Sequence, residues 1–147
     1  VGWIEAEVAE DTAIVLDPAE DPITASKGAR LPLTPDWTAT FGIEFRPRVQ
    51  LLNAQPFARF DLAYVGESIT SLEGIQSVIV PGAVQTLDSY STGDLRFGLE
   101  GEGWSASLFV DNVWDERAEL FLSPRWIAER RSYSRPRTVG LRFRYDF

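Results

Sequence analysis

Apolar and polar side chains alternate strictly at the end of the chain, over positions 139–147. Every second side chain of a β-strand points to the same face, so this pattern predicts a strand with one apolar and one charged face. The apolar positions are Val139, Leu141, Phe143, Tyr145 and Phe147. About 9–11 residues suffice for a tilted strand to cross a bilayer. Because a bare apolar strand at the end of a soluble protein invites aggregation, we interpret this one as facing lipid.

The composition argues against several classes of function. The chain has 22 acidic and 14 basic residues and a net charge of −8, whereas a nucleic-acid partner requires a clustered positive face. It contains no His and no Cys, which removes the usual general base and the commonest metal ligands. Asp and Glu pairs could serve a glycosidase, but their spacing singles out no pair. We therefore predict no enzyme, no metal site, no cofactor and no nucleic-acid partner.

The sequence also lacks any run of about 18 apolar residues that would predict a membrane-spanning helix. Met is absent, and no signal peptide precedes the first strand-like residues. We therefore expect a processed chain or a piece of a longer one.

Alternation of the same kind predicts about six strands in an all-β chain. Their ranges are residues 3–8, 37–46, 57–67, a hairpin with strands near 95–100 and 103–110, and the terminal strand. Long and short connections alternate, which predicts an antiparallel up-and-down meander with its long loops at one end. The long connections are residues 9–35, with a short extended piece at 13–16, residues 68–90, with an apolar run at 78–80, and residues 116–134. The acidic residues of the first connection are interpreted as solvated rather than as a cation site.

The hairpin allows its register to be derived. Apolar residues lie at odd positions before the turn and at even positions after it, so facing apolar pairs require a loop with an even number of residues. A two-residue turn at positions 101–102 satisfies this condition, and Gly101 favours type II′. It would pair Leu99 with Trp104, Phe97 with Ala106, Leu95 with Leu108 and Arg96 with Ser107.

The face opposite the apolar one carries charges of both signs, which suits a water-filled barrel interior. The predicted lumen-facing residues are Glu44, Arg59, Asp61, Arg96, Arg142 and Arg144, with Glu100 and Asp111 on the same face. Single-chain bacterial barrels start at about eight strands, so we expect the terminal segment of a larger transmembrane barrel. Periodicity alone leaves open a soluble β-barrel or sandwich that binds a ligand, and a passive porin-like barrel.

Five local motifs follow one another along the chain. They are Gly28-Ala29-Arg30-Leu31-Pro32-Leu33-Thr34-Pro35, Tyr64-Val65-Gly66-Glu67, Tyr90 with Asp94-Leu95-Arg96, Asn112-Val113-Trp114-Asp115-Glu116-Arg117, and Arg135-Pro136-Arg137-Thr138-Val139-Gly140 leading to Phe147. In this order they resemble the carboxy-terminal barrel region of TonB-dependent outer-membrane receptors. The departures are Ser134, where the family often has Asn, and Trp114, where Phe or Thr is commoner.

The resemblance implies a barrel of about 22 strands, of which residues 1–147 would be the carboxy-terminal portion, without the plug domain and the earlier strands. Such receptors lie in the outer membrane of Gram-negative bacteria. They import bulky nutrients such as siderophore-bound iron, cobalamin or oligosaccharides, using energy relayed through TonB. The partners that it implies are the remaining barrel strands and the plug domain, the TonB complex through the absent plug region, the barrel-assembly machinery and outer-membrane lipid.

Two groups of residues are candidate contact sites. The five apolar residues of the terminal strand look like the signal that the barrel-assembly machinery recognises, in keeping with strand addition at a sheet edge. The connection after the hairpin combines aromatic and guanidinium groups, which suit a flat anionic ligand such as a ferric chelate. The candidate ligand contacts are Trp114, Phe121, Arg125, Trp126, Arg130, Arg131 and Tyr133.

Overall fold

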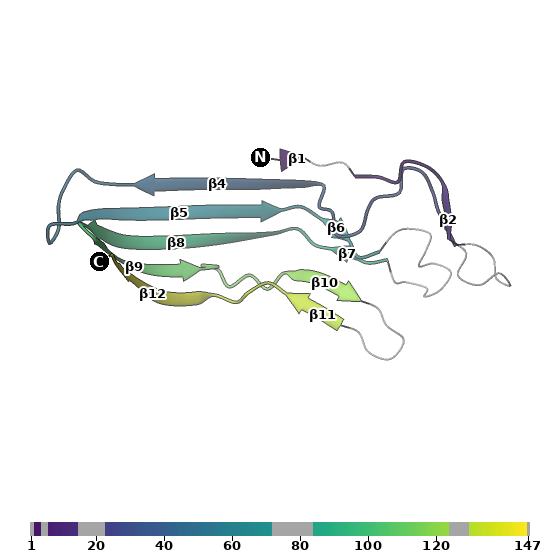
Figure 1. The fold of residues 1–147 in the computed structure, drawn as a ribbon. Helices are drawn as coiled ribbons and strands as arrows, with labels where there is room; N and C mark the ends of the chain where they lie inside the picture. The colour runs from purple at the N-terminus through teal and green to yellow at the C-terminus, as the bar shows by residue number, and fades with distance from the viewer. Residues whose placement is uncertain (1, 4–5, 15–22, 72–83, 124–129, 147) are drawn as a thin grey trace. The chain divides into compact units, whose positions relative to one another are not determined.

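The computed structural model describes residues 2–3, 6–14, 23–71, 84–123 and 130–146. The regular elements in these ranges are all β-strands (Figure 1), and none of these residues forms a helix able to cross a membrane. Six strands form one sheet in which the spatial order follows the chain order. They are β1 (Gly2–Trp3), β4 (Trp37–Phe45), β5 (Gln55–Val65), β8 (Tyr90–Gly101), β9 (Trp104–Asp111) and β12 (Thr138–Tyr145). The prediction of an all-β antiparallel meander of about six strands is therefore confirmed.

The chain divides into two compact units, which are described separately. The sheet unit comprises Ala39–Tyr64, Ser91–Arg117 and Ser134–Phe147, and the loop unit comprises Val1–Thr38, Val65–Tyr90 and Ala118–Tyr133. The sheet unit holds β9, β12 and most of β4, β5 and β8. Three short hairpins belong to the loop unit: β2 (Thr12–Ile14) with β3 (Ile23–Ala25), β6 (Ser68–Ile69) with β7 (Thr86–Leu87), and β10 (Glu119–Ser123) with β11 (Arg130–Tyr133).

Strand register places like side chains in line across the sheet unit. Leu141 of β12 faces Leu108 of β9, which in turn faces Phe97 of β8. One position along β12, Arg142 faces Ser107 on the opposite side of the sheet. We call the side of Leu141, Leu108 and Phe97 the apolar face and the side of Arg142 and Ser107 the polar face. The alternation in the sequence thus becomes two chemically different surfaces.

The predicted register of the β8–β9 hairpin is wrong by two residues. The turn lies at residues 102–103 instead of 101–102. The pairs are Gly101 with Trp104, Leu99 with Ala106, Phe97 with Leu108, Leu95 with Val110, Gly98 with Ser107 and Arg96 with Phe109. A shift of two residues preserves the side-chain parity, so the apolar face stays intact.

Two glycines explain where this turn lies. Gly103 has a φ of 72°, so the left-handed residue is the second one of the turn and not the first. Gly101 meets a different requirement, because a Cβ at that position would lie 2.2 Å from Nε1 of Trp104. The indole ring of Trp104 therefore occupies the space that Gly101 leaves open.

Two further glycines on the polar face lie beneath aromatic rings. Phe57 of β5 covers Gly98, and Phe109 of β9 covers Gly140. A glycine in a strand exposes backbone and weakens the strand, and a ring on the neighbouring strand shields that backbone. These two ring–glycine contacts therefore stabilise the polar face of the sheet unit, which has no apolar core of its own among the described residues.

Gly98→Ala is expected to lower the free energy of unfolding by about 2–3 kcal/mol. The added Cβ would lie 2.6 Å from the backbone oxygen of Ala106, which belongs to a paired strand and cannot rotate away. Gly140→Ala is the matched control, because its Cβ would meet ring atoms of Phe109, and a side chain can move. We expect Gly140→Ala to lower the free energy of unfolding by about 1 kcal/mol. Urea unfolding followed by tryptophan fluorescence measures both, and equal losses would contradict the backbone clash.

The loop unit differs most from the sequence prediction. Of the described residues in the strand predicted at residues 3–8, Trp3 pairs with β4, as does Gly2 before it, whereas Glu7 forms an isolated bridge with Arg30. The extended piece predicted at residues 13–16 is found as Thr12–Ile14, with Ile23–Ala25 as its partner strand. Residues 15–16 and the apolar run at 78–80 lie outside the described residues. Alternation marks a segment as extended, but the choice of partner depends on tertiary contacts.

A small buried core lies within the loop unit. Its largest fully buried side chain among the described residues is Leu122 of β10, and Ile69 of β6 and Leu87 of β7 are also buried. β7 and β10 are in contact. Residues expected to be plain connections therefore form a packed group of hairpins.

Candidate functional site

The apolar face of the sheet unit is open to its surroundings. Leu141 is 83% exposed and Phe45 is 65% exposed. The large apolar residues exposed on this face are Phe41, Ile43, Phe45, Phe97, Leu108, Val139, Leu141, Phe143 and Tyr145. Monomeric soluble proteins rarely expose a contiguous apolar surface of this kind. Such a surface is typical of proteins that contact a membrane or another protein.

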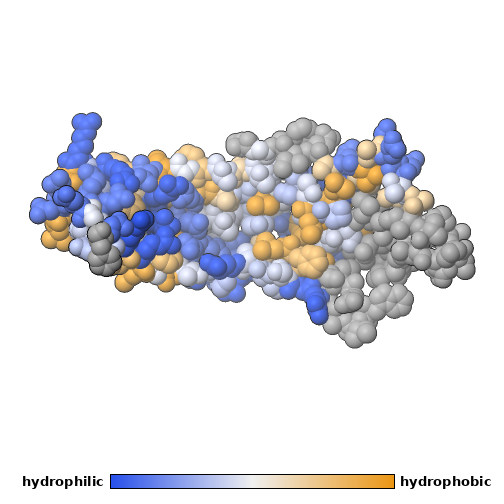
Figure 2. All heavy atoms as spheres, in the orientation of Figure 1, coloured by the Kyte–Doolittle hydropathy of each residue, from blue (hydrophilic) through white to orange (hydrophobic). Residues whose placement is uncertain are grey.

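The polar face carries a network of ion pairs across three neighbouring strands. Arg59 binds Asp61 through two N–H groups, with nitrogen–oxygen distances of 2.7 Å and 2.8 Å. Arg46 donates to Glu44 at 2.5 Å and also pairs with Glu100 of β8. The guanidinium of Arg59 lies 3.6 Å from Glu44. The structure thus brings together Glu44, Arg59 and Asp61, which the sequence placed on one face. Hydrophilic residues dominate the part of this unit seen in Figure 2.

The other residues predicted to face the lumen have different surroundings. The guanidinium carbon of Arg142 lies 5.7 Å from the ring centroid of Phe109, a cation–π distance. Arg144 pairs with Asp146 at 3.1 Å and is strongly exposed. Arg96 has a buried Nε with no hydrogen-bond partner in the described part of the chain. Arg142 and Arg144 therefore have contacts outside the network around Arg59.

A hollow of about 330 Å³ lies on the polar face over β4 and β5. Gly42 creates part of it, since a Cβ there would lie 2.8 Å from Oδ1 of Asp61. The polar side chains that line it are Thr40, Arg59, Asp61 and Asp94. With two carboxylates and one guanidinium in its walls, the hollow suits a polar solute.

The terminal strand lies at one edge of the sheet. Val139, Leu141, Phe143 and Tyr145 project from β12 on the apolar face and are exposed, whereas Phe147 lies outside the described residues. The chain after β12 is still anchored, because the N–H of Asp146 donates to the backbone oxygen of Gly103 at 2.8 Å. An edge strand with an apolar face offers both unpaired backbone groups and apolar contacts to a further strand.

A hydrogen-bonded cluster around Asn112 joins the ends of β8, β9 and β12. The side-chain amide of Asn112 donates to the backbone oxygens of Glu116 at 2.9 Å and Arg135 at 2.8 Å, and its oxygen accepts the N–H of Glu116 at 2.9 Å. Its own backbone N–H donates to Asp94 at 2.9 Å. Asn112 is buried and has a φ of 54°, a backbone conformation that Asn tolerates better than most residues. The sequence pattern singled out this motif but not the central role of Asn112.

Trp114, a predicted ligand contact, takes part in the same cluster. Its indole N–H donates to the backbone oxygen of Ser91 at 2.7 Å, and its ring covers Gly93, where a Cβ would lie 2.3 Å from the ring. The N–H of Val113 donates to the oxygen of Gly93 at 2.8 Å. The indole of Trp114 thus holds the exit of β9 against β8.

Asp115 gives this cluster a dependence on pH. Its carboxylate accepts the backbone N–H of Arg137 at 2.8 Å and N–H groups of Arg117 at 3.3 Å. These contacts, the Arg137 N–H first, hold the pKa of Asp115 below its usual range. The lowered pKa belongs to the folded state, so its contribution to stability is complete above the ordinary value of about 3.9. That contribution is lost as the pH falls through the lowered pKa.

Asp115→Asn is therefore expected to flatten the acid limb of the stability curve. Asn tolerates the φ of 55° at this position and keeps an acceptor for the N–H of Arg137, but it has no charge to lose. The midpoint of urea unfolding should fall more steeply in the wild type than in the variant as the pH drops from about 5 to about 2. Parallel curves for the two proteins would show that the carboxylate of Asp115 does not contribute to the dependence of stability on pH.

The β10–β11 hairpin carries several of the predicted ligand contacts. Leu122 faces Arg131 and Phe121 faces Ser132, with an irregularity in register before Phe121. Arg131 pairs with Glu119 at 2.6 Å, and the hydroxyl of Tyr133 lies 3.3 Å from the same carboxylate. Phe121 and Arg130 are exposed, whereas Arg125 and Trp126 lie outside the described residues. The hairpin thus brings Arg131 and Tyr133 together at Glu119.

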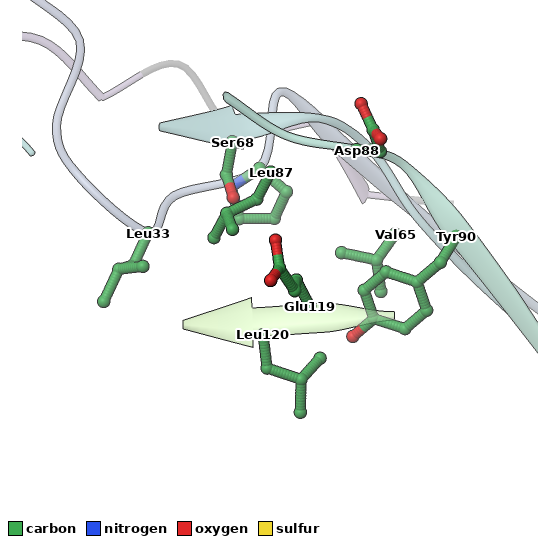
Figure 3. A pocket seen from close by; sticks show the side chains of 10 residues that line it. Leu33, Val65, Ser68, Leu87, Asp88, Tyr90, Glu119 and Leu120 are labelled. Atoms are coloured by element: carbon green, nitrogen blue, oxygen red, sulfur yellow. The ribbon is translucent and has the colours of Figure 1, made fainter. Parts of the chain in front are cut away.

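A cavity of about 110 Å³ lies within the loop unit (Figure 3). Its walls combine the apolar side chains of Leu33, Val65, Leu87 and Leu120 with the polar ones of Ser68, Asp88, Tyr90 and Glu119. The carboxylate of Glu119 points towards Ser68 and Leu87, whereas that of Asp88 points away (Figure 3). Pockets for drug-sized ligands measure about 300–1,000 Å³, so this cavity is too small for a bulky nutrient.

Comparison with known proteins finds no matching family model, no matching curated protein and no matching solved structure. Within the described residues, no group of acidic side chains is arranged to hold a metal ion. The features that bear on function are therefore the two faces of the sheet unit, its open edge and the exposed hairpin.

Proposed function

We propose that this chain forms part of the wall of a transmembrane β-barrel in the outer membrane of a Gram-negative bacterium. The observation that carries the proposal is the contrast between the two faces of the sheet unit. Phe45, Leu141 and Phe143 are exposed on one face, while the other pairs Arg46 and Arg59 with carboxylates. Lipid would remove the cost of exposing the first face, and a water-filled interior would solvate the second.

The open edges of the sheet support the same proposal. β12 forms one edge, and at the other edge the described residues of β1 pair with residues 37–38 of β4. Unpaired backbone groups are costly in lipid, which is why membrane-spanning sheets close into barrels. We therefore propose that the remaining strands of a larger barrel pair with β4 and β12 and complete it.

We further propose that the complete barrel is a TonB-dependent receptor that imports a bulky nutrient by active transport. The support is the ordered set of motifs in the sequence, among them the segment 112–117, which the structure places at the junction of three strands. In this receptor the exposed Phe121 and Arg130 would help to capture the ligand, which is a siderophore-bound iron, cobalamin or oligosaccharide. TonB would act through a plug domain, and the barrel-assembly machinery would bind β12.

Membrane fractionation of cells that produce the full-length protein tests this function. We expect the protein in the outer-membrane fraction, with an electrophoretic mobility that changes on heating as a folded barrel requires. Uptake of labelled nutrients should then depend on TonB. A soluble monomer without detergent would instead indicate a ligand-binding barrel or sandwich, and uptake without TonB would indicate a passive porin.

A further inference from the structure

The short connection between β4 and β5, residues 46–54, ends in a tight turn with an unusual composition. The N–H of Leu51 donates to the oxygen of Ala54, and the N–H of Ala54 donates to the oxygen of Leu51, both at 2.9 Å. The two central residues are Leu52, with a φ of 56°, and Asn53, with a φ of 57°. Positive φ at both positions defines a type I′ turn, for which Asn, Asp and Gly are preferred.

Leu52 is unfavourable in this turn for two separate reasons. Its Cβ crowds the backbone in the left-handed conformation, a strain that Gly does not have and Asn tolerates better. Its side chain is 78% exposed, more than Val49 at 59% or Leu51 at 56%. At this exposure Leu52 buries little apolar surface within the described chain that could offset the strain. Strain that is kept at an exposed apolar residue points to a contact outside the chain.

The connection holds this apolar tip in a defined position. The side-chain amide of Gln55 hydrogen-bonds to the backbone oxygen of Pro47, which joins the two ends of the segment. Ala54 is buried at the base of the turn. Leu51 and Leu52 therefore project from a fixed support.

Charge identifies the partner as a lipid surface. The chain as a whole has a net charge of −8, but residues 46–54 contain two Arg and no acidic residue, and of these two Arg46 pairs with Glu44 and Glu100 on the polar face. Arg48 is exposed within the connection. The segment also starts directly after Phe45, the last residue of β4 on the apolar face, which is 65% exposed. Apolar side chains beside Arg at the margin of an apolar surface are typical of segments that lie in the headgroup region of a bilayer.

We propose that the Leu51–Leu52 turn inserts into the headgroup and upper acyl region of the phospholipid leaflet at this end of the sheet. Arg48 would lie beside lipid phosphates. This inference rests on the proposed function, because it extends the lipid contact of the apolar face beyond the end of β4. The β4–β5 connection is thus a membrane anchor as well as a link between strands.

Single-cysteine labelling tests the depth of the turn, since the chain contains no Cys. Leu52→Cys, Leu141→Cys and Glu102→Cys each carry a bimane fluorophore in the full-length protein, reconstituted in vesicles of phosphatidylethanolamine and phosphatidylglycerol. Glu102 is the matched control, because it is exposed in the β8–β9 turn at the same end of the sheet unit. Phospholipids brominated near the top or near the bottom of the acyl chain quench fluorophores at the corresponding depth.

We expect shallow bromine to quench position 52 more than position 141, deep bromine to quench position 141 more than position 52, and neither to quench position 102. Quenching at 141 with none at 52 would overturn the anchor and leave the proposed function intact. Protection of position 52 from aqueous iodide without quenching by brominated lipid would also overturn it, in favour of a protein partner. No lipid quenching at position 141 would overturn the proposed function and the anchor with it.

Discussion

Leu141→Arg is expected to destabilise the membrane-inserted state by about 2–4 kcal/mol, the cost of a cationic side chain on the lipid face near the bilayer midplane. Leu141 lies in the middle of β12 on the apolar face and is 83% exposed. In a soluble protein a substitution at so exposed a position would change stability by at most about 0.5 kcal/mol. The size of the effect therefore distinguishes lipid from water at this face. Urea-dependent folding into vesicles measures it.

Thr40→Arg is the matched control for this experiment. It adds the same charge to β4, but on the polar face, where Thr40 lines the hollow with Asp61 and Asp94. We expect a change of at most about 0.5 kcal/mol, because the new guanidinium stays in water beside carboxylates. If the two variants lose the same stability in vesicles, the assignment of the lipid face is wrong.

Asn112→Ala is expected to lower the free energy of unfolding by about 4 kcal/mol. Three side-chain hydrogen bonds, each worth about 0.5–1.5 kcal/mol, disappear, and part-buried backbone groups of Glu116 and Arg135 lose their partners. Ala also adopts the φ of 54° less readily than Asn. Urea unfolding in detergent micelles, followed by tryptophan fluorescence, measures the loss.

Two variants separate the hydrogen bonds of Asn112 from its backbone conformation. Asn53→Ala changes an exposed Asn with a similar φ of 57°, so it should show the conformational cost alone, about 1 kcal/mol. Asn112→Gly removes the hydrogen bonds but relieves the left-handed strain, and it should remain strongly destabilised. If Asn112→Gly is as stable as the wild type, the amide hydrogen bonds do not hold the cluster together.

The strands of the sheet unit follow closely from local pattern. Residues 37–46 and 139–147 alternate so strictly that strands at Trp37–Phe45 and Thr138–Tyr145 needed no tertiary information. The same alternation placed Glu44, Arg59 and Asp61 on one face, where the structure joins them in ion pairs. It could not show that Arg142 lies over Phe109, because a rotamer and a neighbouring ring decide that contact.

The register of the β8–β9 hairpin required more than pattern. Turns at 101–102 and at 102–103 each keep the apolar residues on one face, so parity could not choose between them. The packing of Trp104 against Gly101 and the left-handed φ of Gly103 are features of the folded turn. Both glycines were visible in the sequence, but their separate roles were not.

By itself the sequence determined that this protein is an antiparallel β-meander with an apolar and a charged face, because a period of two residues leaves no other way to segregate the side chains. Only the tertiary structure decided which extended segments pair in the loop unit, as with β10 and β11, and where Asn112 finds its partners. Asn112 and Arg135 lie 23 residues apart in the chain, and no local pattern links them. Their contact exists because β9 and β12 are neighbours in the sheet, and that neighbourhood forms only when the chain folds.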